Sequence, residues 1–333
     1  MKHALIVLAA LTTLSLPPAC HAEDPAAVDL VELRLRFTED QELTLTTTVE
    51  QHTTLTRSNR KSESNQTTAI TMALKVLSVD DGAATVKVTI KAIALKRDTG
   101  GSWSYEYDSE NPPDEVRRDI AAYAAVVGKT FTMKLMPTGQ VAELEGHRAI
   151  VKAIRRAVPD RFIVEGMRDV IIDEPVRRFG EDGLTQAIEG AFGFACNTPV
   201  AVGGTWTRTI AIDYGIPVIA DETYTLTGRC DGTVTIAREA ALGPQEYGER
   251  KDGASLKSKY EVSGRQKGTL SVDEATGCVL KTTIIQELHG KRITSVRRAR
   301  KEDVVPIESK ATITIEIKEP PPEEETKDVP EAD

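Results

Sequence analysis

The sequence predicts an α+β protein with one large, mainly antiparallel curved β-sheet, half-barrel-like, and a few central helices covering one face. Three observations predict this fold class. Apolar and hydroxyl-bearing side chains alternate along most of the chain, as in strands with one buried and one wet face. Apolar stripes of helical period are grouped in the centre of the sequence, and short turn motifs join neighbouring strand segments.

The first block of strands begins near residue 43. In residues 43–55 the apolar side chains fall on odd positions and threonines fill the gaps, while residues 70–76 and 84–92 each keep one parity. Asp80–Gly82 predicts a hairpin turn between two of these runs, because Asp and Gly tolerate positive φ. A second hairpin is predicted around Pro137–Gly139, between an apolar run and Val141.

The second block repeats the pattern after residue 200. Turns are predicted at Asp231–Gly232 and Thr276–Gly277. The predicted strands lie at residues 206–212, 224–226, 234–236, 256–272, 279–288 and 311–317.

Helices are predicted between the two blocks. Asp114 is expected to cap a helix that carries Val116 and ends near Val127, and a second helix is expected over residues 147–158. A third stripe has the i, i+4, i+7, i+8 spacing of an amphipathic helix, from Leu184 to Phe192. We expect these helices to lie against the sheet and to line a possible groove, whose candidate lining residues are Ile150, Ile154, Leu184, Ile188 and Phe192. A closed, dry core is favoured over an open groove.

The two ends of the sequence differ from its middle. Residues 1–22 combine Lys2, a short apolar run and small residues before Glu23, which is the pattern of a secretory signal peptide. We expect cleavage after Ala22 and a periplasmic or extracellular protein, with lipid anchoring at Cys20 as the alternative. No later apolar run is long enough to cross a membrane, so no transmembrane span is expected.

The rest of the chain is expected to form one β-rich domain over residues 23–318. An alternative division has two similar halves, about 28–145 and 200–318, joined by helices within residues 147–194. Residues 319–333 are rich in Glu and Pro, and such a segment is expected to be a disordered acidic tail.

Three cysteines remain after the expected cleavage. An exported protein lies in an oxidising compartment, so one disulfide is expected. Cys230 and Cys278 would each begin a strand, two strand spacings or about 10 Å apart, which exceeds disulfide reach. Cys196 lies on a loop, so a possible Cys196–Cys230 disulfide is favoured over three buried thiols.

Candidate catalytic groups are few. His52, His147 and His289 do not show metal-ligand spacing, and no Cys-x-x-Cys is present, so no metal site and no cofactor are expected. The acidic pairs at residues 80–81 and 173–174 are interpreted as turn and loop-end residues. A net charge of −9 and 5% aromatic residues exclude a nucleic-acid binder.

Two motifs carry a resemblance to a known family. Gly128–Leu135 followed by Pro137–Val141 gives a Gly-Lys-x-Phe strand and a Pro-x-Gly turn, and Pro199–Trp206 gives Pro-Val-x-x-Gly-x-x-Trp. Together they resemble a family of exported bacterial β-rich proteins classed as a domain of unknown function. The resemblance extends over about residues 30–288 in layout, and it implies no activity and no site residue.

The leading hypothesis is therefore an exported, non-enzymatic binding or carrier module for an apolar or lipid-like ligand. The alternative is a structural or interaction protein of the cell envelope, in which exposed Thr-rich strand edges pair with a partner protein. A hydrolase with two carboxylates distant in sequence is the third hypothesis. The sequence indicates neither the ligand nor the oligomeric state.

Overall fold

The structure is a computed structural model that describes residues 29–100, 104–159, 167–213, 215–245, 256–296 and 302–319. The expected signal peptide, Cys20 and nearly all of the expected acidic tail lie outside the described residues. Within the described part of the chain, no helix is long and apolar enough to cross a membrane.

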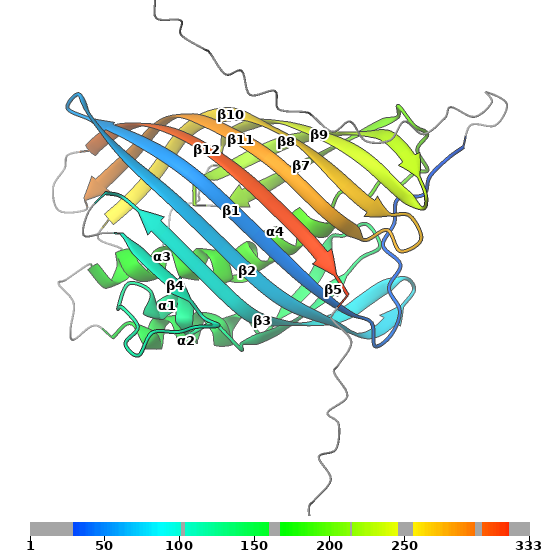
Figure 1. The fold of residues 1–333 in the computed structure, drawn as a ribbon, viewed down its shortest axis with the longest axis horizontal. Helices are drawn as coiled ribbons and strands as arrows, with labels where there is room; N and C mark the ends of the chain where they lie inside the picture. Colours follow the sequence, from blue (N-terminus) through cyan, green and yellow to red (C-terminus); the bar gives the residue numbers. More distant parts are fainter. Residues whose placement is uncertain are drawn as a thin grey trace, which may run out of the picture.

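The described strands all belong to one sheet, which is antiparallel throughout (Figure 1). The strands before the main helices are β1 (Glu42–Arg57), β2 (Arg60–Asp80), β3 (Ala83–Asp98), β4 (Tyr105–Asp108), β5 (Thr130–Leu135) and β6 (Val141–Glu145). Those after them are β7 (Thr205–Asp213), β8 (Pro217–Cys230), β9 (Thr233–Pro244), β10 (Leu256–Asp273), β11 (Val279–Val296) and β12 (Glu302–Lys318).

The strand order is β6-β5-β3-β2-β1-β12-β11-β10-β9-β8-β7, with β4 paired to β3. The first and last long strands therefore meet in the middle of the sheet, where Thr44 pairs with Lys318 and Leu55 with Ile307. The Thr-rich strand β1 is hydrogen-bonded on both sides, to β2 and β12. The strand β1 is thus not an exposed edge. It therefore cannot be the Thr-rich edge that the sequence analysis expected to pair with a partner protein.

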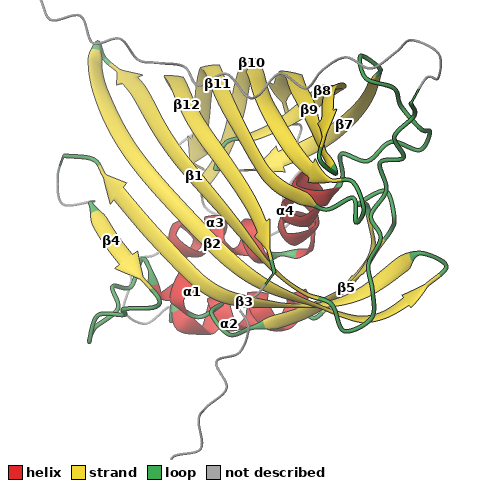
Figure 2. Ribbon diagram, turned by 45° about the vertical axis from the view of Figure 1, so that its right-hand side comes forward, coloured by secondary structure: helices red, strands yellow, loops and turns green. Residues whose placement is uncertain are grey.

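The sheet is bent, and its concave face holds the helices α1 (Ala121–Ala124), α2 (His147–Ala157), α3 (Met167–Phe179) and α4 (Glu181–Phe192) (Figure 2). The helices α2 to α4 connect the two edge strands β6 and β7 along the chain, and α4 packs against both of these strands. The predicted fold class, a large curved antiparallel sheet with a few helices on one face, is confirmed.

Two-residue hairpin turns set the register of β2 with β3 and of β8 with β9. Asp81 and Gly82 have φ of 48° and 77°, and Asp231 and Gly232 have φ of 49° and 73°. Positive φ at both central residues is the geometry whose twist matches that of paired strands. The turns predicted at these two positions are confirmed.

An extended N-terminal strap, residues 29–41, closes one rim of the sheet. Its inward side chains Val31, Leu33 and Leu35 are at most 2% exposed. The Leu35 amide donates to the carbonyl of Pro137 (2.8 Å), and the Arg36 amide donates to that of Thr276 (2.7 Å). The strap therefore joins the β5–β6 and β10–β11 turns, which are far apart in sequence.

Two local predictions are wrong in detail. The helix expected from Asp114 is reduced to α1, which begins only at Ala121 and has no side-chain cap. Before it, the Arg117 side chain contacts the Ser104 carbonyl (2.9 Å), Asp119 (2.9 Å) and the Tyr105 ring. The pair at residues 173–174 lies inside α3 and not at a loop end. Pro175 follows this pair, and a proline in a helix normally marks a break.

Candidate functional site

The concave face carries two separate apolar clusters. The main core joins the helices to β1, β2, β3 and β5 and to one half of the C-terminal strands. The second apolar cluster contains no helical residue among its described members. Its buried members are Ile212, Ile216, Val218, Ala220, Ala240, Leu242, Val262, Leu288 and Ile307, and Leu55, Ile210 and Tyr260 pack against it.

A row of buried polar side chains separates the two clusters on β8 to β11. Its members, which we name the polar belt, are Glu222, Arg238, Gln266 and Gln286, one from each of these strands, and they are 1–5% exposed. On its strand, each belt residue points to the same face as the buried apolar residues before and after it. Glu222, for example, lies on the same face of β8 as Ala220 and Tyr224. The belt therefore faces the interior and not solvent.

Hydrogen bonds run continuously along the polar belt. The Arg238 guanidinium donates to a Glu222 carboxylate oxygen and to Gln266 Oε1, the latter at 2.9 Å. Gln266 Nε2 donates to Gln286 Oε1 at 2.6 Å, across a directly paired position of β10 and β11. Four neighbouring strands are thus joined by side chains as well as by their backbones.

The same level of the sheet is polar on the next two strands. Ser309 of β12 is 6% exposed, and Gln51 Nε2 of β1 donates to its hydroxyl oxygen at 2.9 Å. Ser309 lies opposite Leu288, two pairs beyond Gln286. The polar level therefore continues across the centre of the sheet.

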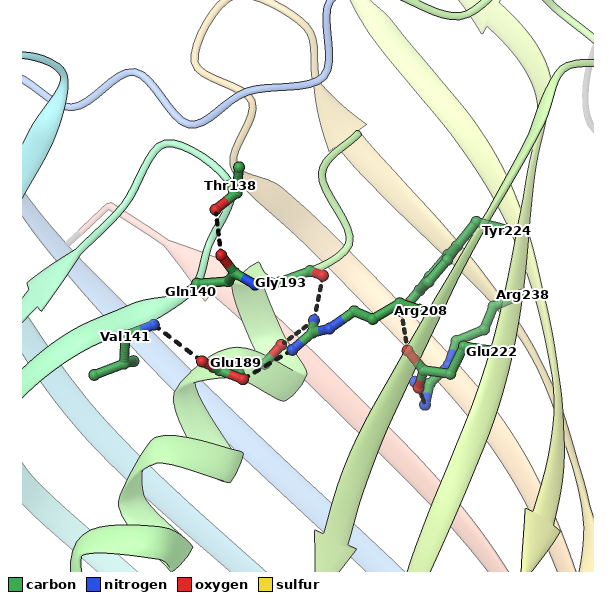
Figure 3. A network of polar contacts seen from close by, with 9 residues as sticks. All are labelled: Thr138, Gln140, Val141, Glu189, Gly193, Arg208, Glu222, Tyr224 and Arg238. Carbon is green, nitrogen blue, oxygen red and sulfur yellow. Dashed lines mark hydrogen bonds and ion pairs between the residues drawn. The ribbon is translucent and has the colours of Figure 1, made fainter. Parts of the chain in front are cut away.

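The belt carries one buried ion pair. The side chains of Arg238 and Glu222 are 5% and 0% exposed. The Tyr224 hydroxyl donates to the other Glu222 oxygen at 2.5 Å, and burial raises the pKa of Tyr224 well above its ordinary value. Tyr224 therefore stays protonated, and the pair is neutral as a whole. Figure 3 shows the side chains of Tyr224, Glu222 and Arg238 in contact.

A small cavity lies where the belt meets α4. Its volume is about 30 Å³, which is room for one or two water-sized groups. It is lined by Gly183, Gln186, Ala187 and Gly190 of α4, by Ile210, Ile212 and Asp213 of β7, and by Arg238 of β9. The lining is therefore apolar except at three side chains.

Two polar atoms of the lining residues have no hydrogen-bond partner among the described residues. They are the Arg238 Nε donor and the Gln186 Oε1 acceptor, both buried. A buried polar atom without a partner costs about 1–3 kcal/mol, so a donor and an acceptor beside one cavity indicate a site for a polar group.

An ion pair between α3 and β7 borders the cavity. The Arg177 guanidinium binds the carboxylate of Asp213, which lines the cavity. One turn away, Glu174 contacts Arg178 at 3.0 Å. Burial alone would raise the pKa of Glu174. This effect is smaller than the combined stabilisation of the carboxylate by Arg178, the Tyr123 hydroxyl and Arg177, so the pKa of Glu174 is lowered.

The helix α4 fixes the position of this cavity through contacts with both sheet edges. Glu189 Oε1 accepts a hydrogen bond from the Val141 amide of β6 at 3.0 Å, and Glu189 Oε2 accepts one from Arg208 of β7 at 2.9 Å (Figure 3). Arg208 also donates to the carbonyl of Gly193, at the C-terminal end of α4. One glutamate thus bridges the two edges of the open sheet.

A family model described as a family of unknown function (DUF6263) matches residues 81–279, more than half of the chain. The chain belongs to this family. The matched region includes α1 to α4, all the residues that line the cavity, and three of the four belt residues. The prediction that this chain belongs to a family of unknown function is confirmed.

Comparison with solved structures finds folds that resemble this DUF6263 protein only distantly. A structure concerned with lipid–protein interactions in lipovitellin has a TM-score of 0.41 and 12% identity, and covers 86% of this chain. The chain spans about a quarter (26%) of that lipovitellin chain. The translocator domain of autotransporter NalP from Neisseria meningitidis has a TM-score of 0.21 and 6% identity, over 85% of this chain and 90% of that one. No curated protein matches the sequence.

The DUF6263 structure places the five predicted groove residues together in the main core. All of them, Ile150, Ile154, Leu184, Ile188 and Phe192, are at most 1% exposed. The cavity lies on the neighbouring face of α4, which carries Gly183, Gln186, Ala187 and Gly190. Ligand binding by the five predicted residues stays a prediction.

The predicted disulfide between Cys196 and Cys230 is wrong, because Cys196 carries a free thiol. The loop that bears it is not free to move toward the rim. The Trp206 indole donates to the Phe194 carbonyl at 2.7 Å on one side, and Val200 bridges to Val31 of the strap on the other. Cys278 is also free and is buried.

Neither the polar belt nor the strap was predicted from the sequence. The signal for the belt was a polar residue at a position with the parity of the apolar residues, as at Gln266 and Gln286 within the predicted strands 256–272 and 279–288. The strap had a clearer signal, since Val31, Leu33, Leu35 and Phe37 alternate with charged residues.

Proposed function

We propose that the protein is an exported, non-catalytic binding module that holds an amphiphilic, lipid-like ligand beside α4, on the concave face of the sheet. The observation that carries this proposal is the buried polar belt between two apolar clusters, together with a cavity lined by two residues that each have a partnerless polar atom, Arg238 of the belt and Gln186 of α4. An amphiphile needs such a boundary, because its polar group and its chain require different surroundings.

Packing alone gives little reason for the belt. Burying an ion pair is often no better for stability than apolar side chains of similar volume, because both charges lose their hydration. A row of apolar residues would continue the pattern of β8 and β9, where Ile236 and Ala220 precede the belt. A role in recognition accounts for polar groups at this level of the sheet.

The second apolar cluster supplies the surface for a chain. Its members come from strands and one turn, and none of the described ones belongs to a helix. Ile210 and Ile212 belong to it and also line the cavity. An alkyl chain that begins at the cavity would therefore meet apolar side chains, whose buried members are at most 7% exposed and would have to move apart to admit it.

Ligand binding can be tested by displacement of a neutral fluorescent probe, N-phenyl-1-naphthylamine, from the protein without residues 1–22. We expect the probe to bind and 1-dodecanol to displace it at a stoichiometry near one. The variant Ala187→Leu fills the cavity and should abolish displacement, whereas Ala142→Leu, the same change at an exposed site on β6, should not. Absence of saturable displacement from the unmutated protein would refute the proposal.

Export is supported only by the sequence of residues 1–22. Expression of the full chain in a Gram-negative host should give a periplasmic protein whose mass corresponds to cleavage after Ala22. A mass that corresponds to a diacylated Cys20 at the N-terminus would replace soluble export with lipid anchoring. Retention of the complete N-terminus in the cytoplasm would contradict both.

A further inference from the structure

We propose that the cavity between α4 and β7–β9 binds the hydroxyl group of an uncharged amphiphile, with Arg238 Nε donating to the hydroxyl oxygen and the hydroxyl donating to Gln186 Oε1. The inference rests on the proposed function, whose ligand class it narrows. It assigns a binding role to Arg238 and Gln186, neither of which was a candidate site residue in the sequence analysis.

The donor and acceptor pattern selects the ligand group. Arg238 Nε is a donor and Gln186 Oε1 is an acceptor, and both are buried without a partner among the described residues. A hydroxyl group accepts and donates at one atom, so it satisfies both. An ether accepts only, and a carboxylate also accepts only when it is ionised.

The charge of the site selects an uncharged group. The Arg238 charge is already matched by Glu222, and the Asp213 charge is matched by Arg177. An anion placed among these two pairs would bring an unmatched charge into a buried site, where charges are costly. The arrangement therefore favours an alcohol over a fatty acid of the same length.

The size of the site limits the group to a hydroxyl or one of similar size. The cavity of about 30 Å³ accommodates a group the size of water. Glycine or alanine occupies three of the four α4 positions that line it, namely Gly183, Ala187 and Gly190. A phosphate or a sugar exceeds this space, so the hydroxyl is expected to be the terminal group of the buried part of the ligand.

The test compares three ligands of equal length in the displacement assay: 1-dodecanol, 1-methoxyundecane and dodecanoate, at pH 8. We expect the alcohol to displace the probe at about five- to tenfold lower concentration than the ether, which corresponds to one hydrogen bond, and the carboxylate to be weaker than the alcohol. Gln186→Leu should remove the advantage of the alcohol over the ether. Gln140→Leu, the same change at an exposed turn, should preserve it.

The outcomes separate the two proposals. Two results would overturn the hydroxyl site but not ligand binding. They are equal displacement by the alcohol and the ether, and an advantage of the alcohol that persists in Gln186→Leu. Either result would mean that the cavity holds an ordered water only. Failure of all three ligands to displace the probe overturns the proposed function itself. If circular dichroism shows that Gln186→Leu does not fold, Gln186→Met is the alternative variant that removes the acceptor.

Discussion

Glu189 of α4 and Arg208 of β7 form an ion pair at 2.9 Å, with side chains that are 24% and 17% exposed. The second oxygen of Glu189 accepts the Val141 amide of β6, so one carboxylate contacts both edge strands of the sheet. An edge strand presents backbone groups that lack a neighbouring strand. In this fold a helix and its carboxylate occupy the gap that a closed barrel would fill with strand pairing.

Removal of this carboxylate should loosen both sheet edges. We expect Glu189→Ala to lower the free energy of unfolding by about 1–3 kcal/mol, because the Arg208 and Val141 donors lose a charged acceptor. Urea denaturation measures the loss, and hydrogen exchange should show faster exchange of the Val141 amide. Glu143→Ala, an exposed glutamate on β6, is the control and should change stability by less than about 0.5 kcal/mol.

Two turn glycines should differ in their sensitivity to the same substitution. Gly139 and Gly203 both have positive φ, 79° and 90°. A Cβ at Gly139 would overlap the backbone carbonyl of Phe192 in α4, whereas nothing lies within 4 Å of a Cβ at Gly203. Gly203→Ala should therefore cost about 1–2 kcal/mol through φ alone, and Gly139→Ala about 2–4 kcal/mol because α4 must also move.

Thermal and urea unfolding of the two variants test this difference. Equal losses would show that the β5–β6 turn does not press against the end of α4. A larger loss for Gly203→Ala would contradict the close approach altogether. Gly139 was predicted as a turn residue from the sequence, but only the structure distinguishes the surroundings of the two glycines.

The local elements were largely predictable from the sequence. The row Ile313, Ile315 and Ile317 is buried on one parity, and the helix expected over 147–158 is α2. Such patterns depend on neighbours along the chain, so a window of residues contains the necessary information. The exception is α3, where Pro175 has the appearance of a helix break.

The arrangement of these elements was less predictable. The pairing of β1 with β12 joins Leu45 to Ile317, and no local pattern states which strand is its neighbour. The polar belt depends on such pairings, because Gln266 and Gln286 become hydrogen-bond partners only when β10 and β11 lie side by side. From the sequence, these residues are isolated polar positions in apolar rows.

The buried ion pair of the belt should show strong coupling. Glu222→Gln leaves the Arg238 charge buried without its counter-charge, so we expect a loss of about 3–5 kcal/mol. The double variant Glu222→Leu with Arg238→Met removes both charges and should recover most of that loss. Urea denaturation of Glu222→Leu, of Arg238→Met and of the double variant completes the double-mutant cycle that measures the coupling.

The same double variant tests the binding role of the belt. We expect it to be folded and yet unable to discriminate 1-dodecanol from the ether, because the Arg238 donor is gone. A stable double variant that still prefers 1-dodecanol to the ether would show that the belt has no role in binding and serves only to fix the register of the strands. A single variant Glu222→Gln within 1 kcal/mol of the unmutated protein would contradict the burial of the pair.

Burial of the Cys278 thiol should make stability fall at alkaline pH. Burial raises the pKa of Cys278 from 9.0 to about 11, although the Thr276 hydroxyl opposes this shift. The unfolded thiol ionises first, so the stabilisation is fully present below pH 9 and is lost as the pH rises toward 11. In the presence of a reductant, we expect a loss of about 1 kcal/mol by pH 9.5 from this group.

Cys278→Ala isolates this contribution from those of the other groups that ionise in the same range. The variant should be less stable at pH 7.5, because it loses a buried sulfur, but its stability should fall less between pH 8 and 9.5. Alkylation by iodoacetamide at pH 8 should be slow at Cys278 until urea unfolds the chain, since only the thiolate reacts. Rapid alkylation of the folded protein at Cys278 would show that this thiol is accessible and that its burial does not govern the pH dependence.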